Sequence, residues 1–199
     1  LVYPSLIYLW LFGLAEILVL FFFRDKLSLE HPIAWLYLVT LVLNLLTAVV
    51  GISDWLRIRP AHVSSGLALT PAQRWPAFAF VLLVGFLGLY GLIAQIGAPG
   101  TNGGIFPENM SLFTLRSFGA FYFCLALGVV PLFWERNLRT ALHQAFAAYG
   151  LVFFITIAAF AYLRLFDFAA RPGGLAYFGA YLIVGIPLIF VFRKHGTGG

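Results

Sequence analysis

Long apolar runs constrain the fold of this chain more than any other feature. Five of them are long enough to cross about 30 Å of hydrocarbon at about 1.5 Å per residue, and a sixth is shorter but adequate. They cover approximately residues 1–23, 33–52, 76–97, 113–134, 141–163 and 175–192. Only 10% of the 199 residues are charged, whereas soluble domains carry about 25%. The sequence therefore predicts an integral membrane protein.

The apolar runs also predict the secondary structure. Lipid offers no hydrogen-bond partners to a backbone, so segments this apolar are expected to be helices rather than open strands. Their lengths are about twice what a tilted barrel strand needs. We therefore expect an all-α fold, a polytopic bundle of six transmembrane helices that forms a single membrane domain over residues 1–199.

The basic residues predict an orientation. In a six-span chain the first, third and fifth connections share one side, and the termini share the other side with the second and fourth connections. The first side carries Arg24, Lys26, Arg116, Arg164 and Arg171. The other side carries more, namely Arg57, Arg59, Arg74, Arg136, Arg139, Arg193 and Lys194. The positive-inside rule then favours cytoplasmic termini. Because the charge of +5 is spread over these connections, it indicates orientation signals and lipid contacts rather than nucleic-acid binding.

Two connections share a sequence pattern. FRDKLSL at 23–29 matches FPENMSL at 106–112, and both lie at expected hairpin tips on one side. Near the fifth connection, FGAY at 178–181 matches FGAF at 118–121. One interpretation is three related helical hairpins that arose by duplication. The alternative is that junctions between loops and membrane helices favour aromatic and small residues.

Glu16 is the most informative single residue, because it lies inside the first apolar run. A carboxylate there costs several kcal/mol unless it is protonated or partnered. Asn44 lies at comparable depth in the second run, and Tyr or Thr groups from other spans could join it. Glu16 is then either the titrating group of a small transporter or channel-like carrier, or a neutral hydrogen-bond partner of Asn44. The second role would be worth about 0.6–2 kcal/mol.

Two charged residues flank the tip between the third and fourth spans. Glu108 lies in the polar loop, and Arg116 opens the fourth span. Arg116 is a candidate for binding an anionic ligand or a partner together with the backbone of residues 97–104. The alternatives are an ion pair with Glu108 or a side chain that snorkels to the lipid headgroups.

His143 is the candidate cofactor ligand. It lies in the first turns of the fifth span, where a neutral imidazole could bind the iron of haem or the magnesium of a (bacterio)chlorophyll. The alternative is an interfacial hydrogen bond. The other histidines fall in connections or in the tail, so no metal site is predicted. No motif indicates another cofactor, which leaves lipid or pigment as the ligand classes.

Three glycines recur every third residue in the third span. Gly85, Gly88 and Gly91 would form a smooth stripe on one side of a helix. Such a stripe favours the close approach of another helix. The same groove could instead hold an apolar ligand such as a lipid, a quinone or a carotenoid.

The segment FTLRSFGAF at 113–121, preceded by Phe106 and Pro107, resembles a pattern in uncharacterised multi-span bacterial integral membrane proteins. The resemblance covers one hairpin tip and the following helix, about a tenth of the chain. The commoner version has Trp where this chain has Phe106 and Phe121. The resemblance implies a bacterial inner membrane and no particular activity.

The function expected from the sequence is non-catalytic. No Walker loop, HExxH, GxSxG or CxxC motif is present. We expect a structural or accessory subunit of a larger membrane complex, whose partners are membrane lipids and other membrane subunits or a second copy. The alternatives are the carrier that uses Glu16 and, more weakly, the pigment-binding or haem-binding subunit that uses His143.

Overall fold

The computed structural model describes residues 3–58, 70–94, 105–106, 110–133, 138–181 and 183. These residues form helices and turns, and no strand occurs among them. The named helices are α1 (Tyr3–Phe22), α2 (Pro32–Ile58), α3 (Pro71–Ile93), α4 (Leu112–Val129) and α5 (Leu138–Ala161). A further helix covers residues 173–181. The predicted all-α fold is confirmed for the described part of the chain.

Two helical stretches are long and apolar enough to cross a membrane. They are Pro32–Ile58, which is α2, and Leu112–Phe133, which is α4 with a short 3₁₀ turn after it. Shorter apolar stretches cover Ile7–Phe22, Ala77–Ile93 and Gly150–Ala161. The end of the sixth expected span, 184–192, lies outside the described residues. Six remains the predicted number of spans.

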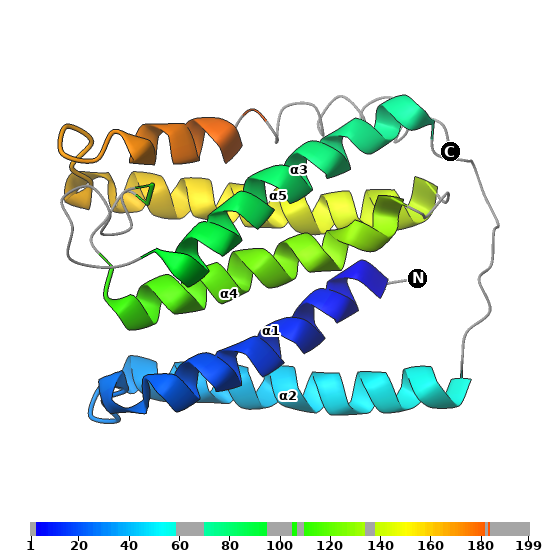
Figure 1. Ribbon diagram of the computed structural model, residues 1–199, viewed down its shortest axis with the longest axis horizontal. Coiled ribbons are helices and arrows are strands. Elements are labelled where there is room, and N and C mark those ends of the chain that lie inside the picture. The colour runs from blue at the N-terminus through cyan, green and yellow to red at the C-terminus, as the bar shows by residue number, and fades with distance from the viewer. Residues whose placement is uncertain are drawn as a thin grey trace.

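Helix α4 lies at the centre of the bundle (Figure 1). It packs against α3 on one side and α1 on the other, and α1 in turn packs against α2 at the edge. The main apolar core lies between α3, α4 and the helix at 173–181. Its members include Phe80, Val84, Leu87, Leu115, Tyr122, Leu125, Val129, Tyr177 and Tyr181. Residues of α5 pack against this core from outside.

Close approach of α3 and α4 depends on glycine. A Cβ on Gly91 would lie 2.6 Å from the Cα of Gly119, and one on Gly88 would collide with the backbone of Phe123. At Gly85 the contact is ordinary, 3.7 Å from the Cβ of Ala126. The helix approach predicted from the glycine stripe is therefore confirmed. Because α4 covers the stripe, this surface leaves no room for the apolar ligand that was the alternative.

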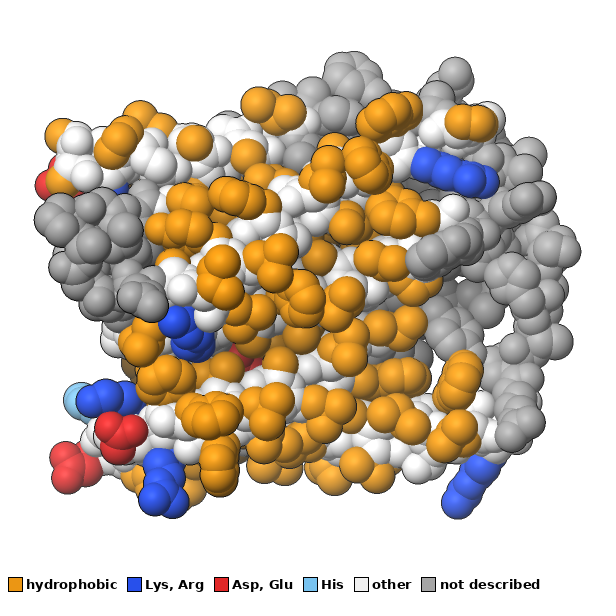
Figure 2. All heavy atoms as spheres, viewed as in Figure 1, with side chains coloured by type: hydrophobic (Ala, Val, Ile, Leu, Met, Phe, Trp, Pro, Cys, Tyr) orange, Lys and Arg blue, Asp and Glu red, His pale blue; other side chains and the backbone are white. Residues whose placement is uncertain are grey.

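Three hairpin tips lie at the same end of the bundle. The turn from α1 to α2, the end of α3 with the start of α4, and the turn after α5 all lie at the left in Figure 1. Charged side chains gather at the ends in Figure 2, and the visible surface between them is almost entirely apolar. Exposed large apolar residues of the helices include Leu18, Phe21, Leu36, Val39, Leu43 and Phe86. This charge distribution is the one that a bilayer would select.

The first and last of these tips share a backbone conformation. Each helix is followed by a short 3₁₀ turn, Arg24–Lys26 after α1 and Leu163–Leu165 after α5. The residues that introduce the turns have similar dihedral angles, −123° and 26° for Phe23 and −108° and 16° for Tyr162. The sequence pattern instead paired the first tip with the second, most of which lies outside the described residues. Duplication remains a hypothesis.

Candidate functional site

Glu16 joins three helices through one carboxylate oxygen. Its side chain is buried, with 3% of the residue exposed. The hydroxyl of Tyr37 on α2 donates a hydrogen bond to Glu16 Oε2 at 2.7 Å, and the hydroxyl of Ser117 on α4 donates to the same oxygen at 3.2 Å. The other oxygen, Oε1, is buried and has no hydrogen-bond partner within the described part of the chain. The site is therefore an acid between α1, α2 and α4 with one oxygen satisfied.

The register between α1 and α2 decides which residue meets Glu16. Residues 10, 13 and 16 share a face of α1, and residues 37, 44 and 51 repeat every seven along α2. A Cβ on Gly51 would collide with the Trp10 ring, and one on Gly13 would lie 3.2 Å from the Asn44 Cβ. The Gly13 contact puts Asn44 opposite Gly13, one turn of α1 away from Glu16, and the long Tyr37 side chain reaches Glu16 instead. The partner of Glu16 on α2 is Tyr37, so the hydrogen bond expected from Asn44 is not formed.

The chemistry of this site is limited to one carboxyl group and two hydroxyl groups. Such a group can accept hydrogen bonds or hold a proton. Within the described residues no group of three or more His, Cys, Asp or Glu side chains lies close enough together to hold a metal ion. The arrangement fits a polar contact between helices or a single proton-binding site.

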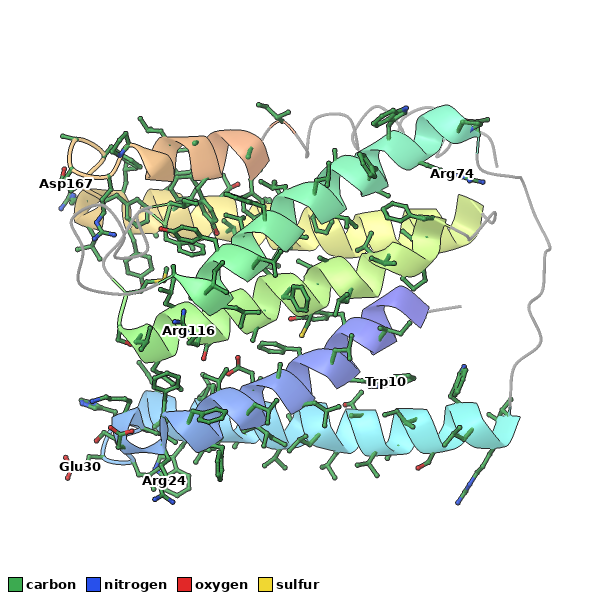
Figure 3. The ribbon with its side chains drawn as sticks, viewed as in Figure 1. Trp10, Arg24, Glu30, Arg74, Arg116 and Asp167 are labelled. Carbon is green, nitrogen blue, oxygen red and sulfur yellow. The ribbon has the colours of Figure 1, made fainter. Side chains whose placement is uncertain are left out.

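Arg116 caps the end of α3. Its Nη1 donates hydrogen bonds to the carbonyl oxygens of Gly91 at 2.7 Å and Ala94 at 2.8 Å. These carbonyls belong to the last turn of α3 and the residue after it. The last carbonyl groups of a helix have no N–H partner within the helix, and the helix dipole favours a cation there. Figure 3 shows Arg116 near the start of α4, toward the end of α3. Glu108, which was one alternative partner for Arg116, lies outside the described residues.

The segment at 113–121, which resembles a pattern in bacterial membrane proteins, has a structural role at the start of α4. Ser111 precedes α4, and its Oγ accepts a hydrogen bond from the Thr114 N–H at 3.1 Å, which is the usual N-cap geometry. Gly119 permits the contact with α3. The Phe121 ring packs edge-on against Tyr8 at a centroid distance of 5.8 Å. Together with Arg116, these residues begin α4 and attach it to its neighbours.

A buried tyrosine cluster was not predicted from the sequence. Tyr122 of α4 is hydrogen-bonded through its hydroxyl to Tyr177, and Tyr181 packs on both rings. Phe106 stacks on Tyr122 at 6.2 Å. The Tyr181 hydroxyl is buried without a partner in the described region. The spacing of Tyr177 and Tyr181, four residues apart on an apolar helix, is the signal that could have indicated a shared polar position.

His143 lies within α5, but its side chain is outside the described part of the structure. Binding of haem or chlorophyll through His143 therefore remains a prediction. Visible absorbance of the purified protein would test it, and a colourless preparation would contradict it.

Comparison of the chain with protein-family models, with curated proteins and with solved structures gives no match. No family assignment extends the resemblance of residues 113–121. We therefore infer a function from the contacts and the surface described above.

Proposed function

We propose that the chain is a six-span protein of the bacterial inner membrane, with both termini in the cytoplasm. We propose further that it acts without catalysis, by packing as a structural or accessory subunit of a larger membrane assembly. The apolar band between the charged ends of the bundle supports the membrane placement. The excess of basic residues on the side of the termini supports the orientation.

The observation that carries the subunit proposal is the isolation of α2. In the most apolar window of α2, only 17% of the residues are buried. In that of Leu112–Phe133, 50% are buried. Among the described residues the one extensive helix contact of α2 is with α1. Large apolar side chains such as Leu36, Leu43 and Val50 are more than half exposed. A partner helix could pack along this surface over most of the length of α2.

The Glu16 site also supports a packing role. One acid that accepts hydrogen bonds from Tyr37 and Ser117 ties α1 to both of its neighbours. Polar side chains that bond across helices in this way stabilise membrane bundles. The site holds α1 between α2 and α4, which leaves the outer surface of α2 uncovered by the described helices.

Photo-cross-linking from α2 tests the proposal. A photoreactive residue at position 36, 43 or 50 of the full chain, expressed in its own membrane, is expected to give adducts with a discrete protein. The matched control is position 154 on α5, which also carries an exposed apolar side chain. Adducts with lipid alone at all three positions of α2 would contradict the subunit proposal.

A second candidate is a small proton-coupled carrier. It is favoured by one observation, namely that Glu16 Oε1 is buried without a hydrogen-bond partner in the described part of the chain. A buried carboxyl oxygen that accepts no hydrogen bond from these residues is a position where a proton or a cation would bind. This candidate predicts that Glu16→Gln abolishes proton-coupled uptake in liposomes and that Glu30→Gln at the exposed tip does not. Equal uptake by the Glu16→Gln protein and the unmodified protein would exclude it.

A further inference from the structure

An apolar groove lies between α1, α3 and α4, apart from the Glu16 site. Its volume is about 590 Å³, and its walls include Leu18 and Phe22 of α1, Leu92 of α3 and Phe123 of α4. Arg116 is the charged residue among those that line it. A volume of several hundred Å³ is typical of sites that hold a small molecule.

The groove has a charged end and an apolar end. Arg116 lies in the second turn of α4, close to the hairpin tips, and Cys124 lies eight residues deeper along the same helix. At about 1.5 Å per residue these two positions are about 12 Å apart along the helix axis. On α1 the lining runs in the same direction, from Phe23 at the tip to Ala15 deeper in the bundle. The cation thus lies at headgroup level, and the apolar lining extends toward the bilayer centre.

Arg116 is held in place by part of its guanidinium only, as far as the described residues show. Its Nη1 is held by the carbonyls of Gly91 and Ala94, so the guanidinium is already positioned. A guanidinium has five N–H donors, of which these two bonds use two. The donors of Nε and Nη2 are not engaged by any described residue. A guanidinium that is fixed in this way, with two donor nitrogens that meet no described residue, is suited to a phosphate, which accepts two parallel hydrogen bonds.

We infer that this groove binds one anionic phospholipid of the bilayer, with its phosphate on Arg116 and one acyl chain along the groove toward Cys124. The charge of Arg116 would bind the phosphate of the lipid, and the apolar walls would bind its acyl chain. The inference rests on the membrane placement proposed above and does not depend on a partner at α2. Recovery of the chain in the membrane fraction tests that placement separately.

Native mass spectrometry of the full chain, purified in a mild detergent, tests the inference. Phosphatidylglycerol is titrated against diacylglycerol with the same acyl chains and against glycerol 3-phosphate, which supplies the head alone. We expect phosphatidylglycerol to bind at least about tenfold more tightly than either, because each lacks one of the two contacts. Equal retention of diacylglycerol, or equal binding of glycerol 3-phosphate, would overturn the inference.

Two variants locate the lipid. Arg116→Gln removes the cation and is expected to lower the affinity for phosphatidylglycerol about tenfold, whereas Arg24→Gln, an exposed arginine at the same end, leaves the affinity unchanged. Because Arg116 also caps α3, Ala15→Phe provides a second test that leaves this cap in place. It fills the deep end of the groove and is expected to weaken binding as well. Unchanged affinity in both variants, or an equal loss in Arg24→Gln, would overturn the inference.

Discussion

At the scale of single residues, the most informative contact is that of one buried acid, Glu16, with its hydrogen-bond donors. Glu16 receives both of its hydrogen bonds on Oε2, from hydroxyl groups on two different helices. A buried polar atom without a partner costs about 1–3 kcal/mol. Removing a donor should therefore lower the free energy of unfolding. Tyr37 makes the shorter of the two bonds, which identifies it as the more important donor.

Tyr37→Phe should therefore lower the free energy of unfolding by about 0.6–2 kcal/mol, the range found for hydrogen bonds between membrane helices. The ring contact of Tyr37 with Phe113 would remain, so the change isolates the hydroxyl. Unfolding of the purified protein in detergent measures the effect. Tyr162→Phe, at an exposed tip position, is the matched control. Equal stability of the two variants would show that the bond to Glu16 contributes nothing.

The sequence identified Glu16 but not its partners. A carboxyl group in an apolar run stands out from composition alone. Tyr37 and Asn44 are seven residues apart and share a face of α2, so either could face Glu16. The choice depends on how far α1 is shifted along α2, which is set by the contact of Trp10 with Gly51 and of Gly13 with Asn44. Such a shift is a property of the packed pair and cannot be read from either segment alone.

At the scale of helices, the contact between α3 and α4 is the most extensive one in the described structure. In the membrane that we propose for this chain, lipid tails are as apolar as the helices, so close backbone packing would replace the hydrophobic effect as the force that holds α3 and α4 together. Gly88 and Gly91 allow this close approach on the side of α3, and Gly119 allows it on the side of α4. Any side chain at Gly88 must separate the two helices or shift their register.

Gly88→Ala should lower the free energy of unfolding by about 1–3 kcal/mol, because its Cβ would collide with the backbone of Phe123. The matched control is Gly85→Ala, one turn away on α3, whose Cβ meets only the Ala126 Cβ at 3.7 Å. Better helix propensity should leave that variant as stable as the unmodified protein or slightly more stable. Both are measured by unfolding in detergent. If Gly88→Ala were as stable as Gly85→Ala, the packing account would be wrong.

Helix positions were largely predictable, but their ends were less so. The apolar runs at 33–52 and 76–97 contain most of α2 and α3. However, α2 continues to Ile58 and α3 begins at Pro71, because a helix can extend past the point where its residues become polar. Proline at the first position of α3 is a signal that could have located its start.

At the scale of the whole molecule, alternation of the helices brings three tips to one end, as counting the apolar runs predicted. The central position of α4 was not predictable from those runs, since it depends on which glycines face which neighbour. The groove beside Arg116 was missed for a related reason. Its walls come from helices whose crossing is set by contacts elsewhere. The order of the helices along the chain can therefore be predicted from the sequence. Which helices pack against one another cannot.

Above all, we propose that this bundle crosses a membrane with its three tips on one side. Single cysteines at Glu30, Ala169 and Arg57, each exposed and introduced with Cys124→Ser, test it through an impermeant maleimide on intact bacterial cells. We expect labelling at positions 30 and 169 without permeabilisation, and at position 57 only after it. Labelling of positions 30 and 169 from opposite sides, or of all three positions equally in intact cells, would contradict this membrane placement.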